Sequence, residues 1–336
     1  MKVAFFELEE WEKGYLAQRI HNHEVNYYTV PLSEVPFEEI KDIEVAVGFI
    51  YSKFSKEIID KFSNLKMIAT MSTGFDHIDV AYCKEKGIPV CSVPAYGDNT
   101  VAEHAFGLLL NLSKNIHKGY IRTLQGDFTF NGLMGFDLKG KTIGVIGTGR
   151  IGQCSIRIAN GFGMNVVAYD AFPKNGLDKE LGFEYVSLDE LYKRSDVITI
   201  HVPLLESTKH LINDDSIGKM KTGMIIINTS RGPIVEEGAL IRGLQTGKIK
   251  GAGLDVLEGE VLIKEERDLI KSQSTLSNEQ LRDMLEDHIL MDMENVIVTP
   301  HLAFYTREAL ERILNVTLDN VFDCVENRGY KNQVNK

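Results

Sequence analysis

Short apolar runs alternate with amphipathic helical segments along most of the chain, in two series. The first series predicts strands at Lys2–Phe6, Val25–Val30, Val45–Ile50, Met67–Met71 and Val90–Val93. The second predicts strands at Thr142–Ile146, Val166–Tyr169, Val197–His201, Ile225–Thr229, Gly251–Asp255 and Val296–Thr299. Alternation of this kind is typical of parallel βαβ units whose helices cover both faces of a sheet. The sequence therefore predicts an α/β fold with two doubly wound parallel-sheet domains.

Three glycines in the stretch TIGVIGTGRIGQ have G-x-G-x-x-G spacing: Gly147, Gly149 and Gly152. The motif follows an apolar strand and opens the helical segment Arg150–Phe162. In a dinucleotide-binding turn such glycines allow a tight bend and bring the pyrophosphate close to backbone N–H groups at the helix N-terminus. A purely structural glycine-rich turn is the weaker interpretation, because the next strand also ends in an acidic residue.

That acidic residue is Asp170, 23 residues after Gly147. A carboxylate at this position accepts hydrogen bonds from the adenosine ribose hydroxyls and repels the 2′-phosphate of NADP. The residues that follow include no arginine to hold that phosphate, although Lys174 is near. NAD is therefore the predicted cofactor. A plain strand-end turn residue is the weaker interpretation of Asp170.

Four charged or titratable residues follow the carboxyl ends of later strands in the second series: Arg231, Asp255, Glu260 and His301. Open α/β sheets bind their ligands at these strand ends. Considered singly, they have plainer interpretations: an exposed loop arginine, a helix-capping aspartate, a solvated glutamate and a hydrogen-bonded structural histidine. Together they are the groups that an enzyme needs to anchor a carboxylate substrate and transfer a proton.

The composition restricts the partners and the compartment. The net charge of −11 and a pI of about 5.4 leave no basic field to attract nucleic acid. No apolar run approaches the ~18 residues of a membrane span, and the N-terminus has no signal-peptide pattern. The four cysteines lack zinc-ligand spacing, and no Cys/His cluster accompanies His21 and His23. We therefore expect a cytoplasmic protein with reduced thiols and no metal.

The order of the elements predicts that the chain crosses its domain boundary twice. An amphipathic helix over Thr100–Lys118, capped by Asn99 or Thr100, separates the two strand series. A final helical stretch, Thr306–Val325, is expected to return to the first domain. A polar, helix-prone insertion, Val261–Met293, has no predicted role. The predicted domains are residues 1–99 with 302–336, and residues 100–301.

The motifs together resemble the D-2-hydroxyacid dehydrogenase family, and its D-lactate dehydrogenase branch most. The resemblance covers nearly the whole chain and rests on the glycine motif with Asp170 and on the stretches MSTGFDHID, VPAYGDNTVAEH, GDFTFNGLMGFDLKGK, HVPL, INTSRG, GLDVLEGE and PHLAFYT. It implies a flavodoxin-like substrate domain (1–99 and 302–336) and a Rossmann NAD-binding domain (100–301), with a cleft between them. It also implies a homodimer built partly on the Thr100–Lys118 helix.

The resemblance further implies roles for single residues. Arg231 would bind the substrate carboxylate, His301 would be the acid/base, and Glu260 would hold that histidine. Asp255 would lie beside the nicotinamide. The full set of implied cofactor contacts is Gly147, Gly149, Arg150, Ile151, Gly152, Asp170, His201, Val202, Pro203, Thr208, Thr229, Ser230, Arg231 and Asp255.

On the substrate side, the resemblance implies that Thr73 and Gly74 bind the substrate carboxylate through backbone N–H groups. Tyr51 and Tyr96 would line the substrate pocket. Gly97 stands where many members of the family have serine, so the detailed shape of its loop is expected to differ. The implied activity is reversible hydride transfer between NADH and pyruvate, giving D-lactate. The alternatives are a dehydrogenase for a larger or phosphorylated D-2-hydroxy acid and a non-catalytic NAD-sensing protein on the same fold.

Overall fold

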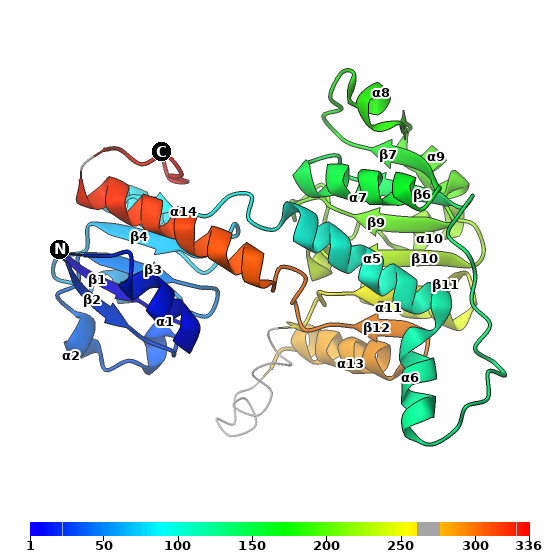
Figure 1. Ribbon diagram of the computed structural model, residues 1–336, viewed down its shortest axis with the longest axis horizontal. Helices are drawn as coiled ribbons and strands as arrows, with labels where there is room; N and C mark the ends of the chain where they lie inside the picture. The colour runs from blue at the N-terminus through cyan, green and yellow to red at the C-terminus, as the bar shows by residue number, and fades with distance from the viewer. Residues whose placement is uncertain (22, 261–275, 327) are drawn as a thin grey trace. The chain divides into compact units, whose positions relative to one another are not determined.

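The computed structural model describes residues 1–21, 23–260, 276–326 and 328–336 (Figure 1). The chain forms two units: unit 1 consists of Met1–Tyr96 with Thr306–Lys336, and unit 2 of Gly97–Tyr305. Of the predicted helix-prone insertion over Val261–Met293, residues 261–275 lie outside the described residues. The remainder contains helix α13 (Asn278–Asp292).

Unit 1 is built on a parallel sheet that, in the described residues, has five strands in the order β2-β1-β3-β4-β5. The strands are β1 (Lys2–Phe5), β2 (Glu24–Tyr27), β3 (Val45–Gly48), β4 (Met67–Thr70) and β5 (Val90–Cys91). Every residue of β3 and β4 is buried, as expected of parallel strands covered on both faces. This strand order is that of flavodoxin-like folds, which agrees with the predicted α/β class.

The helices of unit 1 are short except for the last. They are α1 (Glu10–Ala17), α2 (Phe37–Ile40), α3 (Lys56–Ile59), α4 (Val80–Lys86) and α14 (Arg307–Val325), with a 3-10 turn at Leu32–Glu34. The α14 helix begins after Thr306, whose side chain accepts a hydrogen bond from the Ala309 N–H. It packs on β4 (Figure 1), so the last helix completes the unit that begins the chain.

The C-terminal residues pair with the edge strand β5. Val334 N–H donates to Val90 O at 2.9 Å. Ser92 N–H donates to Asn332 O at 3.2 Å. The side-chain oxygen of Asn335 accepts a hydrogen bond from Val90 N–H at 2.9 Å. These contacts occupy backbone groups that an edge strand otherwise leaves open to pairing with other chains.

Unit 2 contains a parallel sheet whose strands, within the part of the chain that the structure describes, follow the order β12-β11-β10-β9-β6-β7-β8. The strands are β6 (Thr142–Ile146), β7 (Asn165–Tyr169), β8 (Glu184–Tyr185), β9 (Val197–Ile200), β10 (Met224–Asn228), β11 (Ile249–Leu254) and β12 (Val296–Val298). Separate hydrophobic clusters cover the two faces. From β8 to β11 the order is that of the doubly wound dinucleotide-binding fold, which confirms the predicted class. The prediction of six strands was wrong by one, because β8 is a two-residue edge strand without an apolar run.

The helices of unit 2 lie on both faces of this sheet (Figure 1). They are α5 (Asp98–Lys114), α6 (Ile116–Leu124), α7 (Arg150–Gly161), α8 (Leu177–Leu181), α9 (Leu188–Arg194), α10 (Asp214–Lys219), α11 (Glu237–Gln245) and α13, with a 3-10 turn at Gly232–Ile234. The α5 helix runs beside α7 and crosses β10 and β11. The α9, α10 and α11 helices supply residues to the opposite cluster.

The predicted Thr100–Lys118 helix was wrong at both ends. Gly97 occupies the N-cap position, and the Asn99 side chain bonds instead to Glu103 at 3.0 Å. At the other end Asn115 adopts a left-handed backbone, with φ of 52°, and separates α5 from α6. Asparagine tolerates this conformation better than most residues, so it can end one helix and start another.

In the described residues, none of the helices has the length and the apolar character needed to cross a membrane.

Candidate active site

The glycine turn after β6 has the backbone geometry that its motif requires. Gly147 has φ of +96°, and a Cβ there would lie 2.6 Å from the carbonyl oxygen of His201. A Cβ on Gly152 would lie 1.9 Å from the Gly147 oxygen. Around Gly149, by contrast, nothing lies within 4 Å of the Cβ position. The turn is therefore closed on the protein side and open at Gly149, where α7 begins, so a pyrophosphate fits against the helix N-terminus.

Asp170 follows β7 and lies directly beside this turn. Its Oδ2 accepts hydrogen bonds from the Thr148 N–H at 2.7 Å and the Thr148 hydroxyl at 2.9 Å, and its Oδ1 accepts one from the Phe172 N–H at 2.8 Å. Burial alone would raise the pKa of Asp170, but these donors hold it below its ordinary value. The carboxylate is therefore ionised and is held beside the glycine turn. Sequence reasoning missed Thr148, although it lies inside the motif.

His201 follows β9, the strand that pairs with β6 on the side away from β7. This is the point where the strand order reverses and where such sheets bind their ligands. The His201 Nε2 lies 2.9 Å from Ser155 Oγ and 3.0 Å from Thr199 Oγ1. Burial lowers the pKa of His201 to about 4, so the imidazole is neutral. Its Nδ1 is buried without a hydrogen-bond partner among the described residues.

The remaining predicted cofactor residues follow the ends of β6, β9 and β10. Thr208 Oγ1 donates to Pro203 O at 2.7 Å and thereby closes the loop after β9. Ser230 Oγ donates to Ile200 O at 2.7 Å, which ties the end of β10 to β9. Thr229 Oγ1 is buried with no partner among the residues that the structure describes. The other members of this group are Arg150 and Ile151, in the first turn of α7, and Val202, just after β9. The Arg150 Nε lies 3.2 Å from Asp98 Oδ2, in the first turn of α5.

Arg231 follows β10 in extended conformation, with φ of −144°. The Asn228 side chain donates to Arg231 O at 2.9 Å, and Arg231 Nη1 donates to Ser230 O at 2.8 Å. At the next residue, Gly232, a Cβ would lie 2.1 Å from Leu257 O. The residue after Arg231 therefore packs against the turn at 257–260, which carries Glu260.

Glu260 and His301 are in contact. The Oε1 of Glu260 lies 3.0 Å from Nδ1 of His301, and their side chains are 25% and 27% exposed. His301 has φ of +53°, an uncommon conformation for a residue with a Cβ. The structure thus joins two residues that are 41 positions apart in the chain and holds one of them in a strained backbone state.

Asp255 anchors the turn that bears His301. Its carboxylate accepts hydrogen bonds from the N–H groups of Leu302 at 3.0 Å and Ala303 at 2.9 Å, and its backbone oxygen accepts one from His301 N–H at 2.9 Å. The Thr299 hydroxyl donates to the same carboxylate. Burial alone would raise the pKa of Asp255, but the side chains of His104 and Thr299 and these N–H groups hold it below its ordinary value.

His104 of α5 is a second residue that sequence reasoning missed. Its Nε2 lies 3.0 Å from Thr299 Oγ1 and 3.4 Å from Asp255 Oδ1. The stretch VAEH was part of the family resemblance, but nothing in it indicated contacts with Asp255, about 150 positions later, and Thr299, 195 positions later. Through these hydrogen bonds Asp255 fixes the backbone turn that bears His301. The sequence predicted only that Asp255 would lie beside the nicotinamide and did not predict this contact with the turn.

Unit 1 holds the predicted substrate-side residues. Thr73 follows β4, and its hydroxyl donates to Val93 O at 2.8 Å. Tyr51 follows β3, the neighbouring strand, and is 53% exposed. Its N–H donates to Glu7 Oε2 at 3.0 Å. Glu7 follows β1 with φ of +63°, so a glutamate that the sequence did not single out fixes the backbone of the Tyr51 loop.

The two other residues of this set have backbone contacts. The carbonyl oxygen of Gly74 accepts a hydrogen bond from the Ser72 hydroxyl at 2.6 Å. The carbonyl oxygen of Tyr96 accepts a hydrogen bond from Arg312 Nε at 2.7 Å. The loop that ends unit 1 is thereby fastened to α14.

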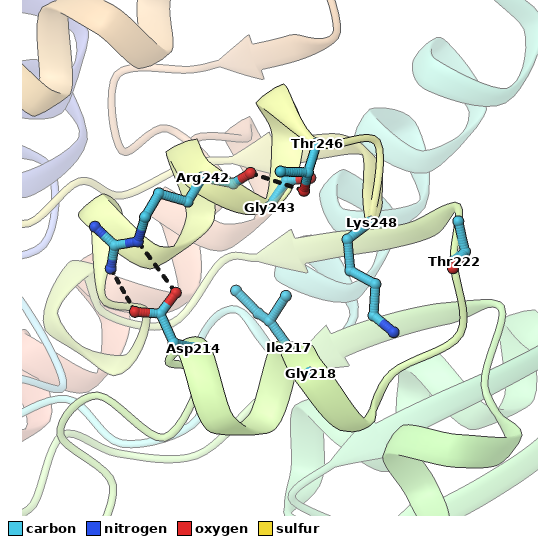
Figure 2. A pocket seen from close by; sticks show the side chains of 8 residues that line it. All are labelled: Asp214, Ile217, Gly218, Thr222, Arg242, Gly243, Thr246 and Lys248. Carbon is cyan, nitrogen blue, oxygen red and sulfur yellow. Dashed lines mark hydrogen bonds and ion pairs between the residues drawn. The ribbon is translucent and has the colours of Figure 1, made fainter.

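A separate surface hollow of about 500 Å³ lies between α10 and α11 (Figure 2). Arg242 projects along it and binds the Asp214 carboxylate through two nitrogens, at 3.1 and 2.6 Å. None of the predicted site residues lines this hollow. Since the Arg242 guanidinium is already paired with Asp214, we do not assign a ligand to this hollow.

Among the described residues there is no group of His, Cys, Asp or Glu side chains that could hold a metal ion.

The edge of the unit 2 sheet combines a glycine turn that is open at a helix N-terminus, an ionised carboxylate beside that turn, and a histidine–carboxylate pair. That combination suits the transfer of a hydride and a proton next to a bound dinucleotide. The fold and the site thus indicate the class of dinucleotide-dependent dehydrogenases.

Comparison with known proteins narrows this class. Residues 106–303 match the NAD-binding domain of D-isomer-specific 2-hydroxyacid dehydrogenases. The chain is 36% identical to the D-lactate dehydrogenase of Escherichia coli, over 99% of this chain and 100% of that protein. It is 40% identical to an aromatic 2-oxoacid reductase of Clostridium sporogenes, over 83% and 82% of the two chains. The solved structure of D-lactate dehydrogenase from Aquifex aeolicus, complexed with NAD and lactic acid, has a TM-score of 0.85 at 38% identity, with 99% of each chain covered.

The chain belongs to the D-isomer-specific 2-hydroxyacid dehydrogenase family. The predicted family, its α/β fold and NAD as the cofactor are confirmed.

Proposed function

We propose that this chain is a D-lactate dehydrogenase, which reduces pyruvate with NADH and oxidises D-lactate with NAD. The observation that supports the reaction most directly is the 3.0 Å contact between Glu260 and His301, beside the strand end that carries Arg231. Two relatives that match nearly end to end are D-lactate dehydrogenases, which supports pyruvate as the substrate. The bound cofactor supplies the hydride.

His301 is the proposed acid/base. Because Glu260 engages Nδ1, Nε2 is the nitrogen left to donate a proton to the 2-oxo oxygen during reduction and to remove it during oxidation. The Glu260 carboxylate orients the ring through this contact. Asp255 sets the position of the His301 turn through its hydrogen bonds.

Arg231 is the proposed substrate anchor in unit 2. A guanidinium can bind a carboxylate with two parallel hydrogen bonds and can stabilise negative charge that develops on the neighbouring oxygen. In unit 1, the N–H groups of Thr73 and Gly74 are proposed to bind the same carboxylate. Tyr51 and Tyr96 are proposed to limit the size of the substrate side chain. Unit 1 is accordingly the substrate domain in this proposal.

Unit 2 is the proposed NAD-binding domain. The open backbone at Gly149 and the N-terminal end of α7, with Arg150 and Ile151, would hold the pyrophosphate. Asp170 would bind the adenosine ribose and exclude a 2′-phosphate. The other proposed contacts lie at the strand ends described above: His201, Val202, Pro203, Thr208, Thr229 and Ser230.

A panel of 2-oxo acids tests the proposal. The purified protein should reduce pyruvate with NADH at a higher kcat/KM than 2-oxoisocaproate, phenylpyruvate or phosphohydroxypyruvate. A higher kcat/KM for phenylpyruvate would favour the second candidate function, a reductase of larger 2-oxo acids. The 40% identity to the aromatic 2-oxoacid reductase is the observation behind this candidate. Absence of turnover with every acid would favour a non-catalytic NAD-sensing protein instead.

We also propose that the enzyme is a cytoplasmic homodimer. Large apolar side chains on α6 and the loop after it are at least half exposed: Ile116, Tyr120, Ile121, Leu124, Phe128, Phe130 and Met134. Exposed apolar patches of this kind mark association surfaces, and they adjoin the α5 helix from which the family resemblance implies a dimer. Sedimentation equilibrium should give the dimer mass, and Phe128→Ser with Phe130→Ser should give the monomer. A monomeric wild-type protein would contradict the proposal, and cell fractionation tests the compartment.

A further inference from the structure

Two carboxyl side chains are buried together behind the turn at 257–260. Glu237, the first residue of α11, is 3% exposed, and Asp287 of α13 is 0% exposed. The two carboxyl groups face each other. Apart from each other and the Gly259 N–H, which lowers the pKa of Asp287, Glu237 Oε2 and the two oxygens of Asp287 meet no hydrogen-bond donor in the described part of the chain. Two ionised carboxylates in such a place would repel each other strongly, so a single proton held between them is the favoured state.

Both carboxyls also contact the turn. Glu237 Oε1 accepts a hydrogen bond from the Glu258 N–H at 2.8 Å. A Cβ on Gly259 would lie 2.6 Å from Asp287 Oδ2, so the backbone of the turn lies against Asp287. The next residue is Glu260. The two buried side chains therefore define where the carboxylate that meets His301 can lie.

We infer that Glu237 and Asp287 share one proton and act as positioning residues, which hold Glu260 within hydrogen-bond range of His301. The inference rests on the proposed function, in which Glu260 and His301 form the acid/base pair. It adds two residues, from α11 and α13, to which neither the sequence nor the family resemblance gave a role.

The charges around the pair are consistent with a retained proton. Burial raises the pKa of both Glu237 and Asp287. The titratable and charged groups that face the pair or its turn are Glu258, Asp283, Glu286, Arg242, Arg282 and His210. The two arginines already bind carboxylates, at Asp214 and Glu286, and the His210 Nε2 lies 2.8 Å from the Glu258 carboxylate. No unpaired positive charge among the described residues is therefore left to stabilise two ionised carboxylates.

The sign of the pH dependence follows from the raised pKa values. A group whose pKa is higher in the folded state stabilises that state at low pH and loses this contribution as the pH rises through the folded value. The pair should therefore hold the turn at neutral pH and release it at alkaline pH. Glutamine at position 237 would keep an oxygen for the Glu258 N–H and would present an NH₂ donor to Asp287. In the Glu237→Gln variant the turn should therefore stay fixed at neutral and at alkaline pH, because no proton between the two side chains is lost.

Hydrogen exchange of the backbone amides measures how strongly the turn at 257–260 is fixed, independently of catalysis. In Glu237→Ala, amide exchange in the peptide that covers residues 254–260 should be at least tenfold faster than in the wild type, and Glu237→Gln should restore the protection. Protection in the wild type should fall at alkaline pH after correction for the intrinsic rate, and Glu237→Gln with Asp287→Asn should not show that fall. Glu279→Gln, which changes an exposed carboxylate of the same helix, α13, is the control. Unchanged exchange in Glu237→Ala would overturn the inference.

Kinetics then separate positioning from a merely structural role. Glu237→Ala should lower kcat for pyruvate by roughly 10–100-fold, as the loss of an outer-shell partner does at other sites, with little change in the KM for NADH. Its pH optimum should move in the same direction as that of Glu260→Gln, and Glu237→Gln should restore both values. Faster exchange with wild-type kcat and pH optimum would overturn the positioning role. If Glu260→Gln itself behaves like the wild type, the acid/base proposal fails, and exchange alone decides whether the pair holds the turn.

Discussion

Thr148 donates two hydrogen bonds to one oxygen of Asp170, from its amide at 2.7 Å and from its hydroxyl at 2.9 Å. The glycine turn and the carboxylate that follows the next strand are thereby fixed to each other. A negative charge is therefore held in a fixed position beside the glycine turn, and it cannot easily move aside for a phosphate.

Asp170→Ala should therefore narrow the preference for NADH over NADPH. The wild type is expected to favour NADH because Asp170 repels the 2′-phosphate. In the variant the ratio of the two kcat/KM values should fall by at least about tenfold, equivalent to ~1.4 kcal/mol. Glu180→Ala, which removes an exposed carboxylate of α8, serves as a control for net charge. Comparable kcat/KM values for NADH and NADPH in the wild type would contradict the proposed role of Asp170 in selecting NADH.

His301→Gln should remove the proton donor and leave cofactor binding nearly unchanged. A positioned acid/base contributes about 10²–10⁴-fold to the rate, so kcat for pyruvate should fall by that factor. The Kd for NADH, measured by fluorescence titration, should stay within about threefold of the wild-type value. His21→Gln, at an exposed site in unit 1, should change neither quantity. A kcat within tenfold of the wild type would show that another group supplies the proton.

Glu260→Gln should move the pH optimum of pyruvate reduction to lower pH. The Glu260 carboxylate lies 3.0 Å from His301 Nδ1, and glutamine lacks the negative charge that attracts a positively charged ring. The measurement is a profile of kcat/KM against pH, with Glu294→Gln, at an exposed position, as the matched control. If the profile stays where it was, the two side chains do not interact during the reaction.

Asp255→Asn should destabilise the fold as well as the site. An amide in place of the carboxylate leaves the N–H groups of Leu302 and Ala303 poorly paired, which costs about 1–3 kcal/mol. The pKa of Asp255 is lowered in the folded state, so its stabilisation is present above the unfolded value and is lost as the pH falls through the folded one. Urea unfolding should thus separate wild type and variant at pH 7 and bring them together in acid. Equal free energies of unfolding at pH 7 would contradict this account.

Tyr51→Leu should shift the substrate preference toward larger 2-oxo acids. Glu7 binds the backbone N–H of Tyr51, a group that leucine also has, so the loop should survive the substitution. Loss of the ring would leave room for a branched or aromatic side chain, and one well-placed apolar group changes relative kcat/KM by roughly 10–200-fold. Phenylpyruvate and 2-oxoisocaproate should gain relative to pyruvate, with the KM for NADH nearly constant. An unchanged ranking of acids would mean that Tyr51 does not set the size of the pocket.

Much of the fold could be predicted because parallel strands buried on both faces have continuous apolar runs, as in β10, where every residue is buried. Edge elements lack that signal, and β8 was missed for this reason. The break between α5 and α6 depends on a single left-handed residue, Asn115, in a region whose apolar periodicity continues through it. Periodicity alone could not place that break.

The site was predictable to the extent that its residues directly follow strands. Arg231 and His301 could be located in that way, since the ends of parallel strands meet at one sheet edge. Contacts that arise from packing between distant elements gave no local pattern. His104 meets Asp255 across about 150 residues, and Glu237 and Asp287 both have the appearance of solvated helix carboxylates when their helices are considered separately. Only the packing of α11 against α13 brings the last two together.

The pairing of the C-terminal residues with β5 has a consequence for synthesis on the ribosome. Residues 1–96 emerge first, but α14 and the segment at 332–335 that complete their sheet emerge only after the whole of unit 2. At ~5–20 residues per second, the roughly 200 residues between them delay completion by about 10–40 s. During that interval β5 has an open edge and β4 lacks the helix that packs on it, so we expect nascent unit 1 to expose surface that promotes aggregation. Slowing translation within unit 2 should therefore increase aggregation more than the same delay after residue 336 has been added.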